Sequence, residues 1–227
     1  MAHPFSSMTP AQVRSQHQQA NFTLAQQNLL SEVEDIVAQV PTRVPAYITL
    51  PELQTIMDYK LAFGQNRPAL RAMIRKNPDA QVKEVSERAL AHSLEDGDWE
   101  EVQKAMDILC ELKGVGPATA SLLLSLLYPR TIPFFSDEAT VNLLAPPGGA
   151  KGIKYTAKTY KALYDALDTL MTSINQNAPS EDPICRGELE RKIWRTFRVE
   201  ELPQSKGKRA RDQENAEEKP KRKRKKT

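Results

Sequence analysis

The 227-residue sequence has too few cysteines and histidines to build the usual metal or disulfide sites. Its two cysteines, Cys110 and Cys185, exclude a disulfide framework, a four-cysteine iron–sulfur cluster and a cysteine-based zinc site. The three histidines are scattered, without the spacing of paired metal ligands. We therefore expect a protein of a reducing compartment that carries no metal cofactor of these kinds.

Long apolar runs are absent as well. The longest, SLLLSLLY at residues 121–128, is far too short to span a membrane, and the first residues lack the apolar stretch of a signal peptide. No segment alternates as a strand would, and no internal repeat is visible. These absences predict a soluble all-α protein with no membrane partner.

Helical spacing of apolar residues, with prolines and glycines between the segments, predicts roughly nine helices. Thr49 and Glu52 have the spacing of a capping box, and Pro117 suits the first turn of a helix because that turn needs no N–H there. The expected helices cover residues 24–40, 50–64, 67–77, 78–94, 98–112, 117–128, 137–144, 156–176 and 183–199.

Charge and composition divide the chain into three parts. Residues 1–22 are polar and glutamine-rich, so we expect a flexible N-terminal segment. Residues 23–203 form the predicted helical domain, and residues 204–227 form a disordered basic tail that has no aromatic and no branched apolar residue to bury. From Lys206 onward there are eleven Lys and Arg against four Asp and Glu, which leaves the preceding residues at net −4 although the chain is +3. Nucleic-acid binding by the body would therefore need a local basic patch.

Two basic clusters in the tail match a bipartite nuclear localisation signal. We expect an import receptor to bind them and the protein to reside in the nucleus, with extra phosphate contacts from the same side chains. A merely solubilising tail is the alternative. The residues of the predicted signal are Lys208, Arg209, Arg211, Lys221, Arg222, Lys223, Arg224, Lys225 and Lys226.

The stretch GVGPATA, residues 114–120, predicts a tight turn between two helices. One of its glycines can take a positive φ, and we expect a bulky residue at Gly116 to strain the backbone. Val115 should point inward, which leaves the amides of the turn and of the next helix, at Gly114, Gly116, Ala118 and Thr119, free to receive a phosphate. A helix C-cap with a close helix contact is the simpler alternative.

A single acidic pair follows the next helix, in PFFSDEAT at residues 133–140. Together, the stretch from Leu112 to Ser121 and Asp137 resemble the hairpin and catalytic segment of the helix-hairpin-helix DNA glycosylases. The resemblance implies an all-α DNA-glycosylase-like body, duplex DNA as partner, and the hairpin from Gly114 to Thr119 as DNA-binding element. It also implies Asp137 as catalytic carboxylate and no cofactor other than a monovalent cation at the hairpin.

Two departures from that family limit the expected activity. Bifunctional members carry a Schiff-base lysine where this chain has Ala118, so the resemblance implies base excision without strand cleavage. Glu138 and Ala139 replace the family's usual Thr-His after the aspartate. The alternative is a catalytically inactive nucleic-acid-binding or adaptor module, in which Ser136 or Asp137 only caps a short helix.

A second stretch, DYKLAFGQNRPAL at residues 58–70, is similar to a group of eukaryotic, mostly fungal, proteins with the same hairpin, and implies no activity by itself. We interpret Tyr59, Lys60, Arg67 and Glu138 as pocket residues. In this interpretation the tyrosine ring stacks on a base, and the lysine ammonium group binds a phosphate. The alternative is a basic strip on the solvated face of a helix, formed by Lys60, Arg67, Arg71, Arg75 and Lys76.

Two further residues have simpler interpretations. Trp194 lies on the apolar side of an amphipathic segment and is predicted to belong to the core rather than to stack on a base. Cys110 is expected to be a buried thiol without chemistry.

Overall fold

The computed structural model describes residues 3–16, 22–64 and 67–198, and every regular element in them is a helix. The elements in chain order are η1 (Pro4–Ser7), α1 (Pro10–Ser15), α2 (Leu24–Gln39), η2 (Val40–Thr42), α3 (Leu50–Phe63), α4 (Pro68–Ile74), α5 (Asp79–Leu90), α6 (Trp99–Leu109), α7 (Pro117–Leu127), α8 (Asp137–Leu144), η3 (Gly149–Gly152), α9 (Ala157–Asn177) and α10 (Arg186–Arg198). The all-α prediction is confirmed for these residues.

The predicted helix start at Thr49 is confirmed. The Thr49 amide donates to the Glu52 carboxylate over 2.8 Å, and the Glu52 amide donates to the Thr49 hydroxyl, so two amides without helical partners are satisfied together. The same carboxylate pairs with the Arg43 guanidinium, which ties the segment before α3 to the helix. This start fixes the direction of α3, the helix that carries Tyr59 and Lys60.

The predicted flexibility of residues 1–22 is wrong for residues 3–16. Thr9 and Gln12 form a capping box that starts α1, and Phe5 and Val13 are buried against the rest of the chain. Arg14 pairs with Glu188 of α10 and anchors the segment. Residues 17–21 and the predicted tail, including its nuclear localisation signal, lie outside the described residues.

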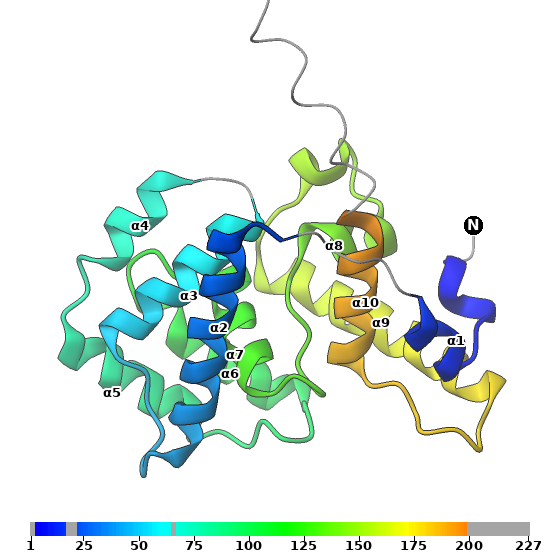
Figure 1. The fold of residues 1–227 in the computed structure, drawn as a ribbon, viewed down its shortest axis with the longest axis horizontal. Coiled ribbons are helices and arrows are strands. Elements are labelled where there is room, and N and C mark those ends of the chain that lie inside the picture. The colour runs from blue at the N-terminus through cyan, green and yellow to red at the C-terminus, as the bar shows by residue number, and fades with distance from the viewer. Residues whose placement is uncertain (1–2, 17–21, 65–66, 199–227) are drawn as a thin grey trace, which may run out of the picture.

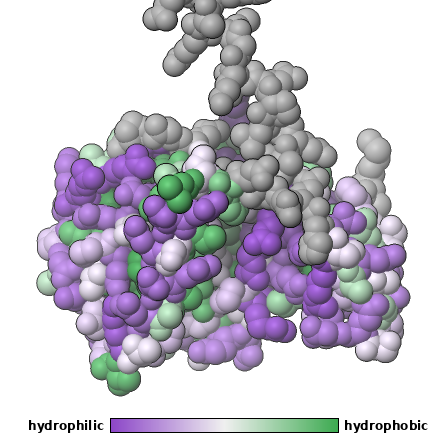
Figure 2. All heavy atoms as spheres, viewed as in Figure 1, coloured by the Kyte–Doolittle hydropathy of each residue, from purple (hydrophilic) through white to green (hydrophobic). Residues whose placement is uncertain are grey.

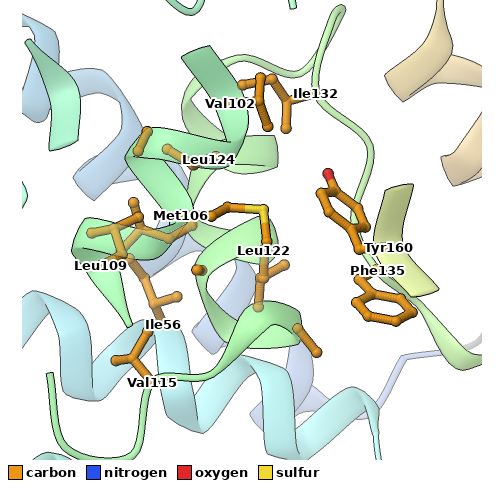
Figure 3. Close-up of a cluster of buried hydrophobic side chains, with 14 of the residues drawn as sticks. Ile56, Val102, Met106, Leu109, Val115, Leu122, Leu124, Ile132, Phe135 and Tyr160 are labelled. Carbon is orange, nitrogen blue, oxygen red and sulfur yellow. The ribbon is translucent and has the colours of Figure 1, made fainter. Parts of the chain in front are cut away.

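The helices form two groups that share one hydrophobic core. Helices α2 to α7 pack on one side, and α8 to α10 with η1 and α1 pack on the other (Figure 1). Buried side chains run continuously through both groups; in the part drawn in Figure 3, Val115 lies near Ile56 while Tyr160 of α9 faces Phe135. Figure 2 shows a largely hydrophilic face, with a hydrophobic patch where α2 begins and Leu24 is exposed.

A network of polar contacts, which we call the seam, joins the two groups. The Arg186 guanidinium donates to the Asp168 carboxylate and to the carbonyl of Thr131, each over 2.6 Å, and stacks on the Tyr164 ring at 4.0 Å. The Tyr164 hydroxyl in turn donates to the Gly97 carbonyl over 2.6 Å. Because helix α9, helix α10 and two loops of the other group meet here, the seam holds the groups at a fixed relative position. Its residues are Gly97, Trp99, Thr131, Tyr164, Asp168 and Arg186.

Candidate functional site

A cleft of about 1060 Å³ lies between the two groups of helices. On one side it is lined by α2, α3 and the start of α7, and on the other by α8, α10 and the loop before α9. Asp137 and the four predicted pocket residues line this one cleft: Tyr59, Lys60, Arg67 and Glu138. Side chains nearly 80 positions apart in the chain are thus brought together around one concave space, the usual setting of a ligand site.

The turn between α6 and α7 lies at the rim of the cleft, and its two glycines have different roles. Gly114 has a φ of +84° and faces α4 so closely that an added Cβ would meet the Met73 Cβ at 3.0 Å. Gly116 has a φ of −120°, an extended backbone that any residue adopts, and open space where a Cβ would lie. The strain predicted for a larger residue at Gly116 is therefore wrong, and Gly114 is the position that requires glycine.

The segment between α4 and α5 clamps the turn through Asn77 and leaves part of the turn's backbone exposed. The Asn77 side chain accepts from the Lys113 amide over 2.8 Å and donates to the Lys113 carbonyl over 2.9 Å. Val115 is buried, as predicted. Among the hydrogen bonds between described residues, none uses the amides of Gly114 and Gly116. These two amides remain available to an anion.

The first turn of α7 faces the interior of the cleft rather than the surface. Ala118 and Thr119, predicted to bind DNA, are 8% and 2% exposed. The Thr119 hydroxyl accepts a hydrogen bond from the Lys60 ammonium group over 2.9 Å. No sequence motif predicted this contact, which places a lysine amine from α3 one residue from Ala118.

Lys60 itself occupies an unfavourable place for a charge. Desolvation by burial and, to a smaller extent, the nearby Arg67 guanidinium lower the pKa of Lys60 to about 8, although the Asp137 carboxylate acts in the opposite direction. No carboxylate of the described residues forms an ion pair with Lys60. With this pKa the amine is mostly protonated at pH 7, and about a tenth of it is uncharged.

Asp137 is the first residue of α8, but it does not cap the helix. The cap is Ser136, whose hydroxyl accepts from the Ala139 amide over 3.2 Å. Upstream, the Phe135 amide donates to the Ser121 hydroxyl of α7, which fixes the segment that leads into α8. The capping role is thus filled by Ser136, and the half-buried carboxylate of Asp137 is available for another function.

Tyr155 holds the Asp137 carboxylate in place from the loop before α9. Its hydroxyl donates to Oδ1 of Asp137 over 2.6 Å, and the Arg67 guanidinium lies 5.3 Å from the centre of its ring. Burial, followed by the hydrogen bond to Asp137, raises the pKa of Tyr155 to about 12, so the phenol keeps its proton. Only one oxygen of the carboxylate has this partner, and the other can act on a ligand.

Glu190 of α10 is a second carboxyl group beside the cleft, and no motif pointed to it. It is 2% exposed, and the Ser136 hydroxyl donates to its Oε1 over 2.6 Å. Burial raises the pKa of Glu190 to about 8, so its side chain is mostly a neutral acid at pH 7. The same serine therefore caps α8 and connects the cap to α10, which positions the adjacent Asp137.

Aromatic rings form the wall of the cleft between α3 and α10. Tyr59 and Phe63 lie 4.7 Å apart between ring centres, and Phe63 lies 6.1 Å from Trp194. Phe22 adds a ring 5.0 Å from Phe63. Trp194 is half-buried and lines the cleft, so the prediction that it belongs to the core is wrong.

The basic strip considered as an alternative is not continuous. Lys60 lies inside the cleft, and Arg71 pairs with the Asp58 carboxylate. Arg75 and Lys76 are exposed at the end of α4. Through the Asn77 clamp they lie next to the turn and to the exposed Lys113, so the local cations gather at the rim of the cleft.

The remaining expectations concern metals, membranes and Cys110. The described residues contain no group of three or more potential ligands that could hold a metal ion, and none of their helices combines the length and apolarity that membrane crossing requires. The monovalent cation at the turn stays a prediction. Cys110 is half-buried, and burial raises the pKa of its thiol to about 11, which favours the unreactive form.

None of the family models, curated proteins or solved structures compared with this chain matches it. The resemblance of the turn and of the Asp137 segment to the helix-hairpin-helix glycosylases therefore rests on the quoted residues alone.

Proposed function

We propose that this chain binds duplex DNA in the nucleus and hydrolyses the N-glycosidic bond of one base, in the manner of a helix-hairpin-helix DNA glycosylase. The observation that carries the proposal is the position of Asp137: its carboxylate faces the cleft, while Ser136 performs the capping that would otherwise explain it. The reaction leaves an abasic sugar in the strand.

The rim of the cleft supports the DNA-binding part of the proposal. The amides of Gly114 and Gly116 can receive a backbone phosphate. Arg75, Lys76 and Lys113 are exposed around the same turn and supply the local positive charge that a body of net −4 otherwise lacks. We expect removal of either lysine charge to weaken binding of all duplexes alike, as contacts with phosphates do.

The interior of the cleft supports the recognition of an extruded base. Its volume of about 1060 Å³ exceeds what one nucleotide needs, and the half-buried rings of Tyr59 and Trp194 line it, in reach of an extruded base that stacks there. Lys60 and Arg67 can approach the phosphates that flank the extruded nucleotide. Stacking and charge thus act at the same place as the proposed chemistry.

The reaction needs a negative charge beside the sugar. Cleavage of the N-glycosidic bond develops positive charge at C1′, and the Asp137 carboxylate can stabilise this charge and accept a proton from the attacking water. The Tyr155 hydroxyl orients the carboxylate through Oδ1. Because the carboxylate is fixed before the substrate arrives, little reorganisation is required in the transition state.

The test is a panel of duplexes, each with one damaged or mismatched base, incubated with the full chain and then treated with alkali to reveal abasic sites. We expect breaks on at least one substrate and a loss of roughly a thousandfold or more in rate for Asp137→Asn. Asp107→Asn, an exposed carboxylate on α6, is the matched control and should keep the wild-type rate. Breaks that persist unchanged in Asp137→Asn would contradict the assigned role.

A nucleic-acid-binding or adaptor module without catalysis is the second candidate. Two observations favour it: the body has a net charge of −4, and Asp137 already has a structural partner in Tyr155, over whose ring Arg67 lies. DNA binding through the turn without alkali-dependent breaks on any substrate would support this candidate and contradict the enzyme.

Nuclear residence depends on the tail in this proposal. Fusions of a large fluorescent protein to the full chain and to residues 1–205 distinguish a localisation signal in the tail from a merely solubilising tail, because a large fusion does not diffuse through nuclear pores. We expect only the full chain to accumulate in nuclei, through an import receptor that binds both basic clusters. Equal nuclear accumulation of the truncated fusion would contradict the assigned signal.

A further inference from the structure

Lys60 brings an amine next to Ala118, the position at which the glycosylase resemblance implies no lysine. Its Nζ lies 2.9 Å from the Thr119 hydroxyl, next to Ala118 at the start of α7. It lines the same cleft as Asp137, and the two side chains are close enough for the carboxylate to influence the titration of the amine. An amine and a carboxylate thus face the space that the proposed reaction assigns to the sugar.

The surroundings of Lys60 favour a reactive amine over a structural ion pair. Its one hydrogen bond to a described group goes to the neutral Thr119 hydroxyl. Burial holds the pKa of Lys60 at about 8, so the free amine with its lone pair is accessible near neutral pH. Desolvated lysines of this kind react with carbonyl compounds to give Schiff bases.

We propose that Lys60 forms a Schiff base with the C1′ aldehyde of an abasic sugar in the cleft, and that the chain thereby also cleaves the DNA strand. This inference rests on the proposed function, because base excision at Asp137 leaves such a sugar in the cleft. It replaces the expectation that Ala118 rules out strand cleavage: the amine comes from α3 instead of from the turn.

The reaction balances without any further reagent. The Nζ lone pair forms the bond to C1′ of the open-chain sugar; the aldehyde oxygen takes one proton from Nζ and one from solvent and leaves as water. Asp137 then removes a proton from C2′, the electron pair shifts toward the iminium, and the C3′–O bond breaks to release the strand with a 5′-phosphate. Water finally hydrolyses the iminium, which releases an unsaturated aldehyde and regenerates the Lys60 amine.

The experiment uses the full chain and a duplex that already contains one abasic site, with sodium borohydride to reduce the iminium to a stable amine. The covalent complex is then resolved on a denaturing gel. We expect the wild-type chain to be trapped and Lys60→Met to lose about a hundredfold or more of the trapping rate. Lys60→Arg keeps a positive charge and a donor for Thr119 but cannot form the iminium, so it should lose trapping equally.

Two controls keep the result specific to Lys60. Lys104→Met removes an exposed lysine of α6 that does not line the cleft, so this variant should be trapped as well as the wild type. Lys60→Met should unfold at an unchanged or higher denaturant concentration, because it removes a charge that burial disfavours. Undiminished trapping of Lys60→Met would assign the amine to another lysine, such as those of the tail, and would overturn the proposal; so would absence of trapping in the wild type.

The outcomes also separate this proposal from base excision. A preformed abasic site makes trapping independent of the glycosylase step, so trapping without excision would leave Lys60 supported and the proposed function contradicted. Excision that yields breaks only after alkali, without trapping, would support the proposed function and overturn the role of Lys60.

Discussion

In the seam, the Arg186 guanidinium faces the Asp168 carboxylate, whereas in the cleft Lys60, Asp137 and Glu190 are each hydrogen-bonded to a hydroxyl group. The seam therefore neutralises the charge that it buries. The cleft keeps an amine and two carboxyl groups near one another without an ion pair between described residues. A buried pair of opposite charges is typical of a structural contact. Ionisable groups that lack a partner of opposite charge and have shifted pKa values are typical of sites where chemistry occurs.

The largest effect is expected from breaking the seam. Arg186→Met leaves the Asp168 carboxylate, the Tyr164 hydroxyl and the Thr131 carbonyl without their common partner. Asp168 is partly exposed to water, so we expect the free energy of unfolding to fall by about 3 kcal/mol, at the lower end of the range for broken buried pairs. Urea denaturation of the wild type and of Arg186→Met measures this loss of unfolding free energy. A loss below about 0.5 kcal/mol, the range of an ordinary surface change, would show that the seam does not hold the two groups together.

The opposite change, a gain in stability, is expected at pH 8.5 when Glu190, a buried acid beside the cleft, is replaced by glutamine. Since the pKa of Glu190 is raised from 4.5 to about 8 in the folded chain, the folded state keeps a proton that the unfolded state loses. The stability that this proton provides is complete below pH 4.5 and is lost as the pH rises to about 8.

Glu190→Gln should therefore flatten the fall in stability between these pH values and be more stable than the wild type at pH 8.5, by on the order of 2 kcal/mol. Denaturation series at several pH values measure this, with Glu188→Gln at the surface pair with Arg14 as control. A parallel pH dependence of the wild type and Glu190→Gln would contradict the buried neutral acid.

The smallest effect on stability is expected at the rim of the cleft. There Gly114 faces the interior, whereas Gly116 faces open space. Gly114→Ala puts a Cβ at a positive φ and against Met73, so we expect a loss of about 1–2 kcal/mol in stability. Gly116→Ala meets nothing and has an extended φ, so stability should stay within about 0.5 kcal/mol. Reduced DNA affinity in Gly116→Ala would then report the phosphate contact alone, whereas equal stability losses in both variants would refute the assigned roles.

The fold was largely predictable from the sequence because its signals are local. Capping residues, helix-breaking prolines and the periodicity of apolar residues lie within one helix, and the start of α3 at Thr49 follows from four consecutive residues. The N-terminal segment was missed although Thr9 and Gln12 form the same capping pattern, because Phe5 and Val13 are isolated apolar residues in a polar stretch.

The site was predictable only in part, because its contacts are long-range. Asp137 and the glycines of the turn stand in short motifs, but the contact of Lys60 with Thr119 and that of Ser136 with Glu190 join helices far apart in the sequence. No local pattern distinguishes Glu190 from the exposed acids of an amphipathic helix. Trp194 was assigned to the core since periodicity identifies the apolar face of α10 but not the cleft that this face borders.

The central claim is that the carboxylate of Asp137 is held in the cleft to stabilise positive charge on a sugar. The most direct measurement compares the affinities of the full chain for two duplexes, one with a cationic pyrrolidine abasic analogue and one with a neutral tetrahydrofuran analogue. We predict that the wild type binds the cationic analogue at least about tenfold more tightly, or about 1.4 kcal/mol, and that Asp137→Asn loses this preference. Equal binding of the two analogues by the wild type, or an undiminished preference in Asp137→Asn, would contradict the account.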